Sequence, residues 1–121
     1  MNPVFNRYFW FHNINKLFMK LDQNSGAEIT LSEAQAHIKE FQMKNPDEVK
    51  SFFIGSNHIK SILDQEGCIG LRIYNGINLE SSRMNQVLIG VNELGNDIKE
   101  GVIVNKAIIC PPECSIINIL D

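Results

Sequence analysis

The sequence has little cysteine: its 121 residues contain only Cys68, Cys110 and Cys114. Small secreted scaffolds use a larger, even number of cysteines to build a disulfide framework. An odd set of three thiols therefore favours a reducing compartment, and we expect the protein to be cytoplasmic.

Long apolar runs and a strong basic charge are also missing. Asn, Lys, Asp or Gly interrupts every stretch of the roughly 20 residues that a membrane-spanning helix needs. The polar side chains within residues 4–21 also break the apolar core that a secretory signal requires. With a net charge of -3, the chain has no basic field for phosphate backbones. We expect no transmembrane segment and no nucleic-acid partner.

The common motifs of catalysis and cofactor binding are absent as well. The sequence has no GxxxxGK[ST] phosphate loop, no GxGxxG, no HExxH and no GxSxG. The three histidines are scattered, and no stretch combines a nucleophile with a base. No cofactor is therefore predicted, and an enzyme of unrecognised type is the weakest of three functional hypotheses.

What the sequence does contain is an ordinary globular mixture, with 44% hydrophobic and 21% charged residues. A chain of this length is expected to form one domain. We divide it into an amphipathic, aromatic N-terminal extension over residues 1–21 and a single α+β domain over residues 22–121. The domain is expected to hold a small antiparallel sheet of three to five strands packed with two or three helices.

The N-terminal extension has no acidic residue and holds six of the ten aromatic side chains. On a helical wheel its apolar side chains share one broad face, opposite Asn and Lys. Such a face needs apolar cover, which predicts binding to a protein partner or self-association. The side chains expected to make this contact are Tyr8, Trp10, Phe11, Ile14 and Phe18.

Two helices are predicted in the domain. Thr30 and Glu33 form a capping box before apolar residues at helical spacing, which predicts a helix over residues 31–44 that ends before Pro46. Ser56 or Asn57 is expected to cap a second, short helix that Gly67 ends. In the first helix the apolar residues at helical spacing are Leu31, Ala34, Ile38 and Phe41; in the second the predicted buried stripe is Ile59, Ile62 and Leu63.

Extended segments follow a period of two. Residues 68–74 and 86–92 are predicted to form an antiparallel pair, with turn residues at Asn75 and Gly76. Shorter strands are expected within residues 50–54, 101–104 and 107–110. The side chains expected to be mostly buried in the central pair are Ile69, Leu71, Ile73, Val87 and Ile89.

Two groups of side chains could carry chemistry. Cys110 and Cys114 flank two prolines, which predicts that the thiols lie close enough to form a redox pair or to share a metal. Zinc would need further ligands, of which Cys68 is the remaining thiol, although Cys68 fits better as a small apolar side chain in a strand. Arg72 and Tyr74 lie on the polar side of their strand, where they could contact a ligand or partner, and they are the residues that an enzyme of unrecognised type would use. We expect Arg72 to meet a carboxylate such as Glu66 or Glu80 in a structural salt bridge.

Five segments follow one another from about residue 29 to 114: LSEAQ, FFIG, ILDQEGCIGLRIYNG, VLIGVNELGND and CPPEC. In these segments the chain resembles a family of small uncharacterised bacterial proteins. The resemblance implies one compact domain and no particular activity. The leading hypothesis is therefore a non-enzymatic interaction or assembly domain, and the alternative is a thiol or metal-binding module built on Cys110 and Cys114.

Overall fold

A computed structural model of the protein describes residues 21–121. In chain order the elements are helix α2 (Leu31–Lys44), strand β1 (Ser51–Phe53), helix α3 (Ser56–Leu63), and strands β2 (Cys68–Ile77), β3 (Met84–Asn92), β4 (Ile103–Val104) and β5 (Ile108–Cys110). The predicted α+β class is confirmed. The amphipathic helix predicted for the N-terminal extension falls on residues 1–20, outside the described residues, apart from Leu21.

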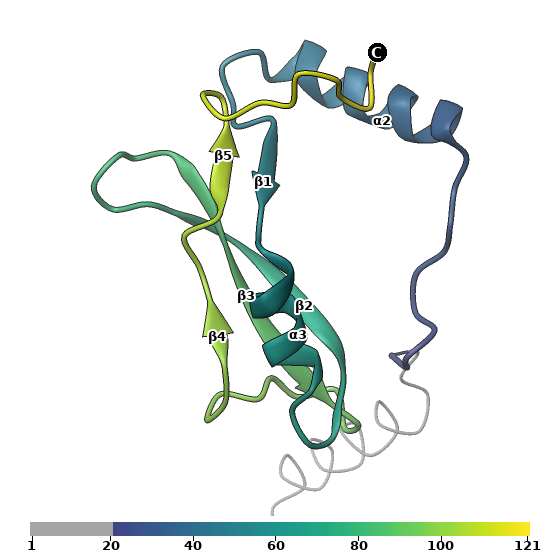
Figure 1. The fold of residues 1–121 in the computed structure, drawn as a ribbon, viewed down its shortest axis with the longest axis vertical. Helices are drawn as coiled ribbons and strands as arrows, with labels where there is room; N and C mark the ends of the chain where they lie inside the picture. The colour runs from purple at the N-terminus through teal and green to yellow at the C-terminus, as the bar shows by residue number, and fades with distance from the viewer. Residues whose placement is uncertain (1–20) are drawn as a thin grey trace, which may run out of the picture.

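The strands form two antiparallel sheets rather than the single sheet that the pattern predicted. One sheet pairs β1 with β5, and the other has the order β2-β3-β4. In Figure 1 the β1–β5 pair lies near the end of the molecule that holds α2. Helix α3 lies beside the long β2–β3 hairpin. The two sheets therefore place α2 and α3 in separate surroundings.

Helix α2 has the predicted boundaries, but none of its side chains is buried. Thr30 Oγ1 accepts a hydrogen bond from Glu33 N at 3.1 Å, which confirms the predicted cap, and the helix ends at Lys44. The C-terminal segment runs alongside the helix in Figure 1, and Gln35 Nε2 donates to the Ile119 carbonyl at 2.9 Å. Leu31 and Phe41, two of the apolar residues at helical spacing, are exposed.

Helix α3 supplies the centre of the core. Ile62 is fully buried and packs with Leu88 and Val104. Partly buried apolar side chains surround this trio: Ile54, Ile59, Cys68 and Leu71. Leu63 is exposed against expectation, since the core is too narrow to receive adjacent helix positions. The predicted side-chain cap at Ser56 or Asn57 is also wrong, because Gly55 is the N-cap and makes no side-chain bond.

The β2–β3 hairpin is antiparallel, as predicted, but longer than predicted. Asn75 and Gly76 pair with Gln86 and Asn85 inside the ladder, so they do not form the turn. The turn lies beyond Ile77, where Asn78 Oδ1 accepts hydrogen bonds from Glu80 N and Ser81 N. The loop therefore forms at the Asx turn of Asn78 and not at the Asn75-Gly76 pair.

Burial along the hairpin depends on the distance from α3. Ile89 is buried, and Ile69, Leu71 and Val87 are partly buried. Ile73 is 51% exposed, which contradicts the predicted burial. The hairpin projects past α3 in Figure 1, and Leu71 packs against the cluster that contains Ile62 of this helix. A register irregularity between Cys68 and Gly70 also interrupts the alternation at Ile69.

Candidate functional site

Three side chains meet at the polar face of β2, two from the strand itself and one from the segment after β3. Arg72 and Tyr74 lie two residues apart on the strand, opposite Ile89 and Val87 of β3. Asp97 follows the turn after β3 and forms an isolated bridge with Val91, which brings it to the same sheet. The turn is fixed by Asn92, whose Oδ1 accepts from Leu94 N and Asn96 N at 3.0 Å each. Asp97 is therefore held beside the strand by backbone bonds.

Asp97 binds both side chains of β2. Arg72 Nη1 lies 2.5 Å from Asp97 Oδ1 in a partly buried salt bridge. The Tyr74 hydroxyl donates to the other carboxylate oxygen, Asp97 Oδ2. The predicted salt bridge of Arg72 is confirmed, but Asp97 takes the place of Glu66 or Glu80. Sequence spacing gave no signal for this partner, because 25 residues separate it from Arg72.

The shared hydrogen bond shifts the pKa values of both acids in opposite directions. The bond to Asp97 raises the pKa of Tyr74, because ionising the phenol would remove the donated proton and set two negative charges together. The same bond lowers the pKa of Asp97, and Arg72 lowers it further against the opposing effect of burial. The cluster is thus most stable with a charged carboxylate and a neutral phenol.

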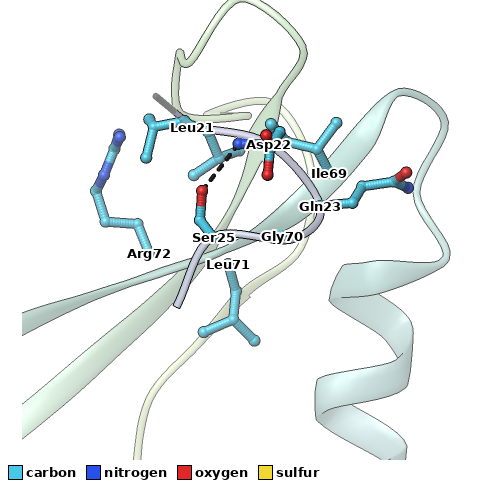
Figure 2. A pocket seen from close by; sticks show the side chains of 9 residues that line it. Leu21, Asp22, Gln23, Ser25, Ile69, Gly70, Leu71 and Arg72 are labelled. Carbon is cyan, nitrogen blue, oxygen red and sulfur yellow. Dashed lines mark hydrogen bonds between the residues drawn. The ribbon is translucent and has the colours of Figure 1, made fainter. Parts of the chain in front are cut away.

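A shallow hollow of about 230 Å³ lies next to this cluster. The turn at residues 21–25 lies across β2 at Ile69, Gly70 and Leu71, and Arg72 is at one side (Figure 2). The turn is closed by Asp22 N, which donates to Ser25 Oγ at 3.0 Å. Small-molecule sites usually enclose roughly 300–1,000 Å³. The hollow is small, and the guanidinium beside it is already neutralised by Asp97, so the arrangement fits a structural role.

The two C-terminal cysteines form the second group. Cys110 and Cys114 are joined by a disulfide with a Cα–Cα distance of 4.8 Å, so the predicted proximity is confirmed. Cys68 is a free thiol at the start of β2 and packs against the core, as its apolar surroundings predicted. Within residues 21–121 no group of three or more His, Cys, Asp or Glu side chains is placed to hold a metal. The predicted interaction side chains from Tyr8 to Phe18 lie outside the described residues.

The chain matches no family model, no curated protein and no solved structure. Within residues 21–121, no helix is both long and apolar enough to span a bilayer.

The Tyr74–Asp97 hydrogen bond should make both the stability of the fold and the ionisation of Tyr74 depend on Asp97. Asp97 stabilises the fold above its unfolded pKa, near 4, and this contribution is lost as the pH falls through its lowered folded value. Tyr74 stabilises the fold below its unfolded pKa, near 10, and this contribution is lost as the pH rises through its raised folded value. We expect Asp97→Asn to shift the ionisation of Tyr74 to lower pH.

Phenolate absorbance measures this shift in a Tyr8→Phe background, where Tyr74 is the remaining tyrosine. Glu93→Gln is the matched control, since it removes a carboxylate from the same turn without touching Tyr74. An unchanged Tyr74 titration in Asp97→Asn would show that the hydrogen bond does not exist in solution.

Proposed function

We propose that the protein is a non-enzymatic assembly domain that associates with a second copy of itself. The observation that carries this proposal is helix α2, which is well capped and amphipathic yet has no buried residue. An isolated helix of 14 residues is marginal in water, and helices in proteins depend on packing of their apolar face. The apolar side of α2 therefore requires a surface that residues 21–121 of the same chain do not supply.

The apolar face of α2 consists of Leu31, Ala34, Ile38 and Phe41. Leu31 and Phe41 are exposed, and Ala34 and Ile38 are only partly buried. The C-terminal segment that runs alongside α2 carries two further exposed apolar side chains, Ile116 and Ile117. Exposed apolar surface of this kind marks protein interfaces.

The charge distribution supports a second copy as the occupant. Helix α2 has an acidic first turn at Glu33 and a basic last turn at Lys44, which also pairs with Glu40 at 2.8 Å. Antiparallel pairing of two such helices sets each acidic turn toward a basic turn and opposes the two helix dipoles. A two-fold interface uses the same surface on both subunits, so it requires this kind of self-complementarity.

The N-terminal extension and the rest of the chain also carry net charges of opposite sign. Residues 1–21 hold three of the 11 basic residues and none of the 14 acidic ones, so residues 22–121 are acidic. Self-association through the extension, with Tyr8, Trp10, Phe11, Ile14 and Phe18 as contacts, is part of this proposal. So is cytoplasmic residence, which the cysteine content favours.

Substitutions on opposite sides of α2 test the proposal. Phe41→Glu places a charge on the apolar face and is expected to convert a dimer into a monomer, because a carboxylate cannot be buried without a partner. Met43→Glu is the matched control, since Met43 lies on the opposite side of the same helix and is already exposed. Light scattering of the full chain gives both masses.

Three outcomes would decide against the proposal or limit it. A monomeric wild-type chain at the concentrations tested would reject self-association. Dissociation by Met43→Glu but not by Phe41→Glu would reject the assigned face. Deletion of residues 1–18 is expected to weaken the dimer, and an unchanged dissociation constant would assign the interface to α2 alone.

A further inference from the structure

The disulfide lies at the boundary between a fixed strand and an exposed loop. Cys110 ends β5, pairs with Ser51 of β1 and accepts a backbone hydrogen bond from Lys50 N at 2.8 Å. It is only 8% exposed. Cys114 lies within residues 111–119, all of which are exposed. The two sulfur atoms therefore belong to residues that differ sharply in their access to solvent.

This difference decides which sulfur atom an incoming thiolate reaches. Thiol–disulfide exchange requires attack along the disulfide axis on one sulfur, and the other sulfur leaves as a thiolate. The shielded position of Cys110 prevents attack there and leaves Cys114 as the accessible target. Exposed disulfides are the labile ones, whereas buried cysteines are inert.

An arginine holds the loop that follows Cys110. Arg83 Nη1 donates to the carbonyl of Pro111 at 3.0 Å, one residue after Cys110. The loop is also held in place, because Glu113 N donates to Ile109 O and Cys114 N to Pro112 O, each at 3.1 Å. After the disulfide opens, these bonds keep Cys110 close enough to attack again.

We propose that Cys110–Cys114 is a thiol–disulfide exchange site that receives a thiolate at Cys114 and uses Cys110 as the resolving cysteine. The substrate class is a thiol, either a small molecule or a protein cysteine. This site is independent of the proposed self-association. In a reducing compartment it would cycle between its two states, as cytosolic disulfides usually do.

With glutathione as the thiol, the exchange takes place in two displacement steps. Its thiolate sulfur attacks Sγ of Cys114 and forms a mixed disulfide, while the Cys110–Cys114 bond breaks and its electron pair leaves on Cys110 Sγ. A second glutathione thiolate then attacks the glutathione sulfur of the mixed disulfide. The products are oxidised glutathione and a reduced Cys110–Cys114 pair. In the reverse direction, the Cys110 thiolate attacks Cys114 Sγ and expels glutathione.

Peptide mapping of the trapped intermediate tests the direction of attack. The oxidised full-length chain, with Cys68→Ser to remove the third thiol, is mixed with reduced glutathione, quenched with acid and analysed by mass spectrometry. We expect one glutathionyl group on Cys114 and none on Cys110. Equal labelling of both cysteines, or labelling of Cys110 alone, would overturn the assignment. So would three free thiols in the wild-type protein purified under oxidising conditions.

Single-cysteine variants give a second measurement. In the Cys68→Ser background and with oxidised glutathione, Cys110→Ser is expected to form its mixed disulfide at least about tenfold faster than Cys114→Ser, because only the exposed thiol is accessible. Circular dichroism checks that both variants are folded, and light scattering of the same samples follows assembly separately. Equal rates in two folded variants would overturn the proposal. A monomeric chain that still labels at Cys114 would reject self-association and leave the exchange site standing.

Discussion

Replacing Ile62 with alanine is expected to lower the free energy of unfolding by about 2–5 kcal/mol. Ile62 is 0% exposed, and it packs against Leu88 and Val104 at the centre of the core. Truncation removes apolar contacts on every side and leaves a cavity that the strands of the small sheet cannot readily fill. Because domains of this size are stable by roughly 5–15 kcal/mol, one residue would account for a large part of the total.

Leu63→Ala is the matched control for this substitution. Leu63 is the next residue on the same helix, but it is 44% exposed and lies outside the central cluster. Its truncation is expected to cost less than about 1 kcal/mol. Urea unfolding followed by far-ultraviolet circular dichroism measures both. A loss from Leu63→Ala as large as that from Ile62→Ala would place the core elsewhere.

The contrast between these neighbours shows what the sequence could specify. Helical spacing gave the same weight to Ile62 and Leu63, because both fall on one side of a short helix. Which of them is buried depends on how wide a surface the hairpin offers, and that is a property of the tertiary arrangement. The same limit applies to Ile73. The alternating pattern correctly predicted a strand there, but this strand projects past α3.

Sequence motifs predicted correctly those features that depend on contacts between residues close together in the chain. The capping box fixed the start of α2 at Leu31. Gly67 has the predicted positive φ, 74°, but it does not end α3, which stops at Leu63 with Asp64 as its C-cap. Cys110 and Cys114 are four residues apart, so their approach followed from spacing alone. Asp97 could not be found in this way, since its role depends on a backbone bridge that joins distant segments.

Gly90→Ala is expected to destabilise the protein by about 1–3 kcal/mol through overpacking. Gly90 is buried in β3, and an added Cβ would lie 2.9 Å from Gln65 Nε2 and 3.0 Å from Cys68 Sγ. Gln65 cannot move aside freely, because Nε2 donates to Ile62 O at 2.9 Å and Oε1 accepts from Val102 N at 2.7 Å. Cys68 is restrained as well, since its Sγ donates to Gly70 O.

Gly70→Ala is the matched control, because Gly70 lies in the adjacent strand and an added Cβ there meets nothing within 4 Å. It is expected to leave stability within about 0.5 kcal/mol of the wild type. A double-mutant cycle then identifies the cause of the Gly90→Ala effect. In a Gln65→Ala background the nearest obstacle is removed, so Gly90→Ala should cost less than it does in the wild type. Thermal and urea unfolding give all four free energies. Full additivity, or equal losses at Gly70 and Gly90, would show that Gln65 does not pack over β3.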